Sequence, residues 1–357
     1  MTLKLEIAGL ILLAVSLAAC SKAAPPEKAE QPKTSSQVAA TTNPVTEAAT
    51  PGPAPAPATV SRGVKTEMRN VMFHLTDKAP AHVETLSGEL WPTGKNDMPM
   101  FDDKTSYEVR VTNARVSITP QALASILNTH VFAKSDAPIK DISISIDKDR
   151  MLIKGKLHSK GDIPFETTGT LSVTSDGRIR VKTEKVKAMH VSVKGLMDKL
   201  GIELANVVNT SKIDGIDSDK NDLLMDLRTL LPPPHINGKV AAVKLENNAI
   251  ITIFGDGGAT APRVSEAGSY MAFQGNPVRF GKLVMESTDI IVLDMDSGDP
   301  LDWNQDHYRE QLVAGYSKIT PSFGLRAYVK DYAKLPRAPT SPPSPVPTTA
   351  PSTPAQN

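Results

Sequence analysis

The chain has few aromatic side chains, a nearly balanced charge and a single cysteine. Aromatic residues make up 4% of its 357 residues, which leaves few rings on which bases or sugars could stack. The formal net charge is +1, so no overall field favours nucleic acid as a partner. One thiol can form neither an intrachain disulfide nor a cysteine metal cluster. We therefore expect no nucleic-acid partner and no cofactor.

Sequence signatures of catalysis and of metal binding are also missing. The chain contains no G-x-S-x-G elbow, no Walker loop and no G-x-G-x-x-G between a strand and a helix. Its seven histidines are scattered and none has zinc spacing such as H-E-x-x-H. No pair of carboxylates is singled out by its spacing. We therefore predict that the protein is not an enzyme and has no catalytic residues.

Two groups of acidic residues have ligand types that suit a metal ion. Residues 217–228 begin like a calcium loop, but Asp222 stands where the loop needs Gly and Arg228 where it needs Glu. An acidic first turn of a helix is the preferred interpretation there. The second group could gather on one cation, although a solvated acidic loop is preferred; it contains Asp294, Asp296, Asp299 and Asp302.

Long hydrophobic runs are scarce, and the clearest one lies at the N-terminus. Ile7–Leu17 is shorter than the roughly 20 residues that span a bilayer as a helix, but it suits a signal peptide. Leu17-Ala18-Ala19-Cys20 resembles the bacterial lipobox. The resemblance implies cleavage before Cys20 and acylation of its thiol, and two or three acyl chains anchor a protein stably. An ordinary signal peptide with an incidental cysteine is the alternative.

Composition divides the chain into five segments. Residues 1–19 are the predicted lipoprotein signal, and 20–61 are a Pro/Ala/Thr-rich segment expected to be a disordered tether. Residues 62–258 are predicted to form the main strand-rich α+β domain. A C-terminal hairpin/helix module packed on the same domain is expected over 259–335, and a disordered Pro/Ser/Thr-rich tail over 336–357.

The strongest structural signal is an alternation of apolar and polar residues over 139–193. Ile142, Ile144 and Ile146 alternate with polar residues, and Asp176-Gly177 is a typical hairpin turn. Side chains in a strand point alternately to opposite faces, so this pattern predicts a sheet with one apolar and one polar face.

Helices are expected to be few. Thr119 followed by Pro120 predicts the start of a helix that ends near Asn128. Further helices are predicted over 194–208 and 219–231. The expected fold class is α+β: a curved, mostly antiparallel sheet packed on or wrapped around a few helices, with disordered tails.

Three stretches resemble bacterial envelope lipid-binding proteins: 116–127, 177–181 and 193–197. The likeness is to the LmeA-like phospholipid-binding type and the wider tubular lipid-binding (TULIP-like) group, and it covers about residues 105–255. It implies a highly curved sheet around a long helix, and binding of lipid without catalysis. The predicted helices are shorter than that long helix, and 259–335 has no counterpart in the family.

The predicted function is therefore that of a lipoprotein anchored by Cys20 in the outer membrane and facing the periplasm, with the inner membrane as the alternative. It would bind or shuttle lipid or another amphiphile in an apolar groove. The candidate lining residues form the apolar stripes of two predicted helices: Leu123, Ile126, Leu127, Leu196, Met197 and Leu200. Two alternative interpretations remain. The apolar face could be a filled core without a ligand, or the protein could be a structural or assembly lipoprotein that binds protein or peptidoglycan. No particular protein partner is indicated.

Overall fold

The computed structural model describes residues 62–94, 96–159, 161–184, 187–188, 213–219, 222–256, 268–296 and 298–336. These parts are mostly strand with a few short helices, so the strand-rich part of the α+β expectation is confirmed. The predicted strong curvature is not confirmed, because no sheet of the described residues is strongly curled. The signal, the tether with Cys20, nearly all of the tail and the helix predicted over 194–208 lie outside the described residues.

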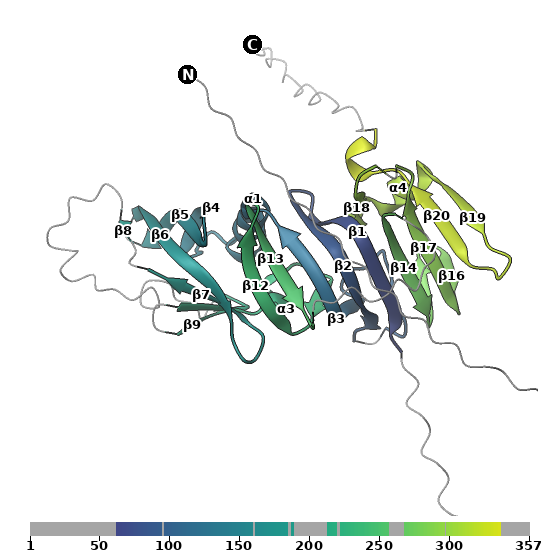
Figure 1. Cartoon of the computed structure of the whole chain (residues 1–357), viewed down its shortest axis with the longest axis horizontal. Coiled ribbons are helices and arrows are strands. Elements are labelled where there is room, and N and C mark those ends of the chain that lie inside the picture. Colours follow the sequence, from purple (N-terminus) through teal and green to yellow (C-terminus); the bar gives the residue numbers. More distant parts are fainter. Residues whose placement is uncertain are drawn as a thin grey trace, which may run out of the picture. The chain divides into compact units, whose positions relative to one another are not determined.

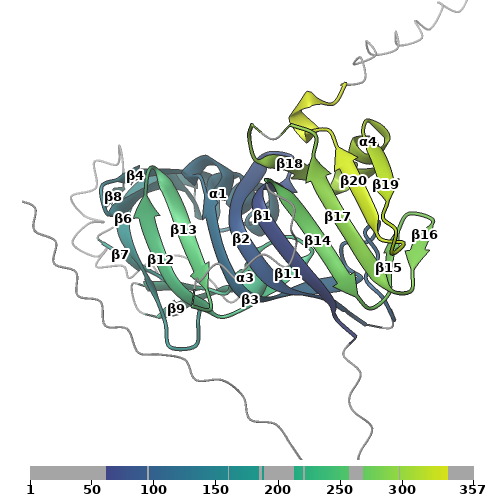
Figure 2. The ribbon, with the colours of Figure 1, turned by 45° about the vertical axis from the view of Figure 1, so that its right-hand side comes forward.

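A large sheet runs through the described chain in the order β12-β13-β3-β2-β1-β14-β17-β20-β19, with β11 beside β3 and β18 beside β1 (Figures 1 and 2). Neighbouring strands are antiparallel except for β1–β18, β3–β11 and β17–β20. Its strands are β1 (Val64–Thr76), β2 (Ala79–Pro92), β3 (Tyr107–Ile118), β11 (His235–Asn237), β12 (Val240–Glu246), β13 (Ala249–Phe254), β14 (Tyr270–Gly275), β17 (Thr288–Asp294), β18 (Leu301–Asn304), β19 (Tyr316–Ile319) and β20 (Leu325–Val329).

The alternation of buried and exposed residues in strand β1 shifts by one residue halfway along the strand. Val64 and Met68 are buried in its first half, whereas Val71 is buried in the second. Asn70 lies between them in the left-handed region with φ of 50°, which asparagine tolerates better than most residues. Its side chain is fixed from both sides, since Asn70 donates to Ser269 Oγ at 2.8 Å and His82 Nε2 lies 2.9 Å from its Oδ1. The bend therefore keeps both halves of β1 against the core.

A small sheet, in the order β4-β5-β6-β7-β10-β9 with β8 beside β6, contains the described part of the predicted ladder. Ile142 and Ile144 are buried while Ser143 and Ser145 are exposed, so the alternation is confirmed. Gly177 turns the β6–β7 hairpin with φ of 85°, a conformation that favours glycine. The strands are β4 (Ile139–Asp147), β5 (Arg150–Ser159), β6 (Gly161–Val173), β7 (Ile179–Thr183), β8 (Lys187–Ala188), β9 (Ile216–Asp219) and β10 (Asp222–Met225).

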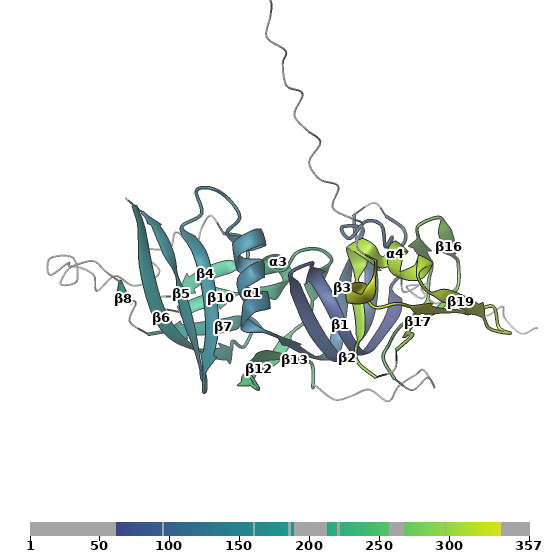
Figure 3. The same ribbon diagram turned by 90° about the horizontal axis from the view of Figure 1, so that it is seen from above.

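Helix α1 (Pro120–Ile126) begins as predicted, because Thr119 Oγ1 accepts a hydrogen bond of 3.1 Å from the backbone N–H of Ala122. One π-helical turn, Leu127–Val131, extends it. Asn128 then joins this turn to β4: its amide donates to Ile142 O at 2.7 Å and accepts from Ile142 N at 2.8 Å. Helix α1 contacts both β4 and β2, so it links the small sheet to the large one (Figure 3).

The helix predicted over 219–231 is wrong. The chain forms β9 and β10, which pair with each other, and then the single turn α3 (Leu227–Leu230). Arg180 of β7 lies 2.8 Å from Asp222, and Arg178 lies 2.9 Å from Asp217. Strand pairing with β7 and these cross-strand ion pairs outweigh the helical spacing of the leucines. Asp217 and Asp222 therefore neutralise arginines, whereas Asp226 caps the single turn α3 by accepting from the backbone N–H of Arg228.

The C-terminal residues add strands to the large sheet and a short helix beside it. Strand β14 pairs with β1 and with β17, and β15 (Val278–Phe280) and β16 (Leu283–Met285) form a separate hairpin. Helix α4 (Tyr308–Val313) is held by Gln311, whose fully buried amide donates to Asp302 O and Lys330 O at 2.7 and 2.9 Å. One-turn 3-10 helices lie at Gln305–His307 and Tyr332–Lys334. No described helix is long and apolar enough to cross a membrane.

Candidate functional site

An apolar cavity of about 140 Å³ lies where the large sheet faces the small one. Five strands of the large sheet, β1, β2, β3, β11 and β13, form one wall. The small sheet, α1 and α3 form the other. Its lining residues are Met68, Phe73, Leu75, Ala81, Val83, Leu86, Val109, Val116, Ile118, Leu123, Met151, Leu171, Ile179, Met225, Leu227, Leu230, Leu231, Pro234, Ile236, Ile250, Thr252 and Phe254.

The register of the large sheet explains why space is left at this point. Phe73 of β1 pairs with Ala81 of β2, and Ala81 pairs with Ile118 of β3. Directly paired residues point to the same face of a sheet. One methyl group therefore stands between two large side chains. Ala81 itself is buried, with 4% of its surface exposed.

The opposite wall is built from flexible and branched apolar side chains. The small sheet contributes Met151 of β5, Leu171 of β6, Ile179 of β7 and Met225 of β10. Methionine has an unbranched, polarizable side chain that adapts to irregular shapes. Met68 lies on the facing large sheet. Both walls therefore carry methionines that can adjust to ligands of different shape.

The chemistry of the lining is nearly uniform. Thr252 is the one residue with a polar side chain among those that line the cavity. A dry apolar cavity of about 150 Å³ takes up a benzene-sized molecule, and the volume here is similar. The lining therefore offers dispersion contacts and release of water, and very little hydrogen bonding to a ligand.

The predicted lining residues divide into three groups. Leu123 lines the cavity. Ile126 and Leu127 do not: Ile126 is fully buried in a cluster with Ala79 and Leu231, and Leu127 packs in the core between α1 and the small sheet. Leu196, Met197 and Leu200 lie outside the described residues. Most of the wall is formed by sheet residues that the sequence does not single out, because an alternating pattern shows which face is apolar but not where that face is left unfilled.

A polar groove of about 190 Å³ lies over β1, β2 and β14. Lys65 pairs in register with Glu89 across the two strands, which is a favourable cross-strand charge pair. Glu67 accepts a hydrogen bond of 2.5 Å from the Tyr270 hydroxyl. Burial and this carboxylate raise the pKa of Tyr270. These groups satisfy one another, as expected of a solvated sheet face, and the groove is not our candidate site.

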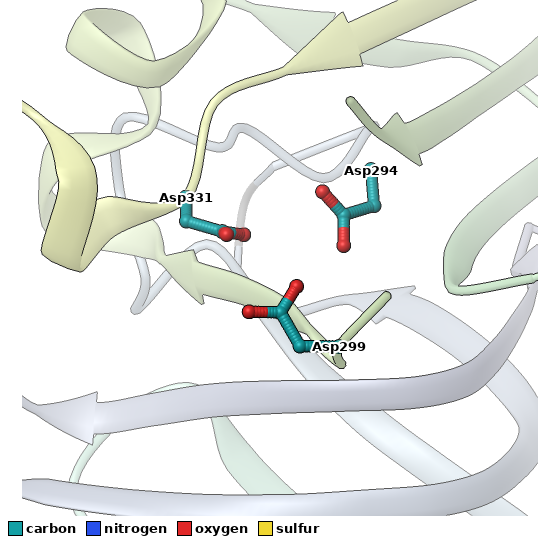
Figure 4. A group of neighbouring side chains, drawn as sticks. All are labelled: Asp294, Asp299 and Asp331. Carbon is teal, nitrogen blue, oxygen red and sulfur yellow. The ribbon is translucent and has the colours of Figure 1, made fainter. Parts of the chain in front are cut away.

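The acidic residues of 294–302 come together only in part. Ligand atoms of Asp294, Asp299 and Asp331 lie within 4.8 Å of one another, and their carboxylates turn toward a shared space (Figure 4). The Lys334 ammonium lies 2.8 Å from Asp331 and 3.3 Å from Asp299, and it also contacts Asp296. The hydrogen bond to Asp331 is the main reason why the pKa of Lys334 is raised. A lysine of the chain thus supplies the positive charge that this acidic group attracts.

Asp294 and Asp302 differ from their neighbours in this region. Burial, and after it the nearby carboxylates, raise the pKa of Asp294 to about 6. Asp302 faces away toward His74, whose Nε2 lies 2.6 Å from its Oδ1. Burial raises the pKa of Asp302, but the hydrogen bonds from His74 and from the Ala333 N–H outweigh burial and hold it below its usual value. Asp302 therefore ties β1 to the C-terminal residues.

No family model, no curated protein and no solved structure matches the chain.

Proposed function

We propose that the protein binds the apolar part of a lipid or another amphiphile in the cavity between its two sheets, without catalysis. The supporting observation is a partly open space of about 140 Å³ whose walls are apolar except for Thr252. An unfilled apolar space costs dispersion contacts, so a guest that fills it stabilises the fold. The same walls give a charged or strongly polar guest almost nothing to bond with.

The size of the cavity restricts the guest. A space comparable to one that holds benzene suits the end of a single acyl chain or a small ring, and it is too small for both chains of a diacyl lipid. The polar head of such a ligand would remain in water. We therefore expect amphiphiles with one slender apolar tail to bind best, and bulky polycyclic molecules to bind poorly.

The location belongs to the same proposal. Its support is the lipobox-like sequence that ends in Cys20, followed by a Pro- and Ala-rich stretch. Acyl chains on Cys20 would hold the domain close to the outer membrane on the periplasmic side, where a carrier of single amphiphiles would meet its ligand. Replacing Cys20 by Ser tests the anchor: the protein should lose its acyl mass and move to the soluble fraction, and unchanged membrane association would contradict anchoring.

Native mass spectrometry of the full chain purified from envelopes tests the binding. We expect one adduct per protein with the mass of a single amphiphile, lost on delipidation and regained when an envelope lipid extract is added back. An unlipidated Cys20→Ser protein should regain the same adduct, which separates the guest from the covalent anchor. A delipidated protein that takes up nothing from the extract would refute the proposal.

A structural or assembly lipoprotein is the second candidate function. Other large apolar side chains are exposed on the β15–β16 hairpin, among them Leu283 at 47% and Val284 at 42%. Exposed apolar groups of this kind often mark sites of interaction. They lie on elements that do not line the cavity, so a partner at this surface and a guest in the cavity do not compete.

A further inference from the structure

We propose that the hairpin of β19 and β20 docks on a lipid surface through Ile319 and Phe323 at its tip. This proposal does not depend on the cavity. Phe323 is 85% exposed and Ile319 is 74% exposed. Ile319 directly precedes a turn, and Phe323 lies within it. The turn is closed by hydrogen bonds from Thr320 N to Gly324 O at 2.7 Å and from Phe323 N to Thr320 O at 2.9 Å.

The backbone of Phe323 gives a reason to look for a function. Its φ is 63°, a left-handed conformation that is unfavourable for a bulky residue and that glycine or asparagine would adopt more easily. A mostly exposed phenylalanine gains little from packing within the fold. Folding alone would therefore not favour phenylalanine at this turn, and strain of this kind commonly accompanies a functional role.

The residues below the tip match the layers of a membrane interface. Tyr316 and Tyr328 stack with their ring centroids 4.6 Å apart. The Lys318 ammonium lies 5.6 and 5.3 Å from the two ring centroids. Amphipathic aromatic rings and lysines are the side chains that settle among lipid headgroups, while phenylalanine and isoleucine enter the acyl region. Residues 316–328 contain two basic side chains and no acidic one. Arg326 is paired with Asp289 at 3.2 Å, so Lys318 supplies the positive charge that favours an anionic surface.

The same features argue against a protein partner. Strand β19 is the edge of the large sheet, but it is only four residues long and has Lys318 within it. Short edge strands with a lysine are protected against pairing with another strand. Two side chains at a tip also cover far less than the roughly 800 Å² per partner of a stable protein interface. A bilayer needs no matching surface, and a tethered domain would meet it at high effective concentration.

A fluorescent label at the tip tests the contact directly. Cys20 is the only cysteine, so the full chain carrying Cys20→Ser can be labelled at Ser322→Cys with an environment-sensitive dye. On vesicles of phosphatidylcholine with phosphatidylglycerol, the emission should shift to the blue and be quenched by lipids brominated on their acyl chains. The control is Asp149→Cys, at the exposed turn between β4 and β5, and its emission should not change.

Variants with a matched control test which side chains matter. In the Cys20→Ser chain, Ile319→Ser with Phe323→Ser should lower vesicle partitioning at least tenfold, which corresponds to about 1.4 kcal/mol. Val313→Ser removes a side chain that is 86% exposed at the end of α4 and should leave partitioning unchanged. Phe323→Gly should lower partitioning while raising the melting temperature, because glycine relieves the left-handed strain. That result separates a membrane role from a structural one.

Three outcomes would overturn the proposal. One is a tip label that stays unshifted on vesicles. Another is a double serine variant that partitions like the parent chain. The third is a dimer, detected by light scattering, that the double serine variant dissociates, because the tip would then be an interface between two copies. Native mass spectrometry of the cavity guest stays unaffected in each case, so the two proposals fail independently.

Discussion

Replacing Ala81 by Leu should stabilise the ligand-free protein. Ala81 stands between Phe73 and Ile118 on the wall of the cavity, and Leu would project three further carbon atoms into it. Each newly buried methylene contributes about 0.8 kcal/mol, so the expected gain is about 2 kcal/mol. For a domain of this size, the melting temperature should rise by roughly 4–8 °C.

The assay is urea and thermal unfolding of delipidated protein, with Ala114→Leu as the matched control. Ala114 of β3 is equally buried but does not line the cavity, and it pairs with Leu86 and Phe254. Its replacement should overpack the core and cost about 1–3 kcal/mol. If Ala81→Leu is destabilising by a similar amount, the space beside Ala81 is already filled and the reasoning fails.

The same variant connects the cavity to its guest. A ligand at about a hundred times its dissociation constant raises the unfolding free energy by about 2.7 kcal/mol. The wild-type protein should show this increase with a single-chain amphiphile, whereas Ala81→Leu should show little or none, because its own side chain occupies the space. Equal stabilisation of both proteins would place the ligand elsewhere.

Three further substitutions test other contacts. Asp294→Asn should remove a fall in the unfolding free energy between about pH 4 and pH 6. The pKa of Asp294 is raised from 3.8 to about 6 in the folded protein, so the folded state holds the proton more tightly than the unfolded state. The stability gained from this protonation is lost as the pH rises through that range. The difference between the two unfolding curves across this range measures the effect. Asn128→Ala should cost about 1–3 kcal/mol in urea unfolding, because both backbone groups of Ile142 lose their partner. Gly88→Ala should destabilise by a similar amount, since its Cβ would lie 2.1 Å from the backbone oxygen of Arg110; an unchanged midpoint would refute either estimate.

Local signals predicted local structure well. Thr119 and Pro120 predicted the start of α1, and the alternation around Ile142 and Ile144 predicted a one-sided sheet. Asp176-Gly177 predicted a hairpin turn with glycine in the left-handed region. Each of these signals depends on neighbours in sequence, through capping, side-chain alternation or turn geometry.

Contacts between distant residues explain the failures. The leucines near 224 have helical spacing, but pairing with β7 makes them strands. Asp331 joins Asp294 and Asp299 from a different element, which spacing along the chain cannot show. The cavity likewise depends on the register that places Ala81 between two larger residues of other strands. The apolar stripe of a predicted helix pointed to Leu123 as a lining residue. The sheet residues that line the cavity around it carry no comparable signal in the sequence.

The pairing of β1 with β14 has a consequence for how the protein is made. Val64 lies opposite Gly275, so one edge of β1 cannot be covered until more than half of the chain has been synthesised. Until then that edge offers free backbone groups to any neighbouring strand. Assembly of the large sheet therefore waits for the C-terminal strands.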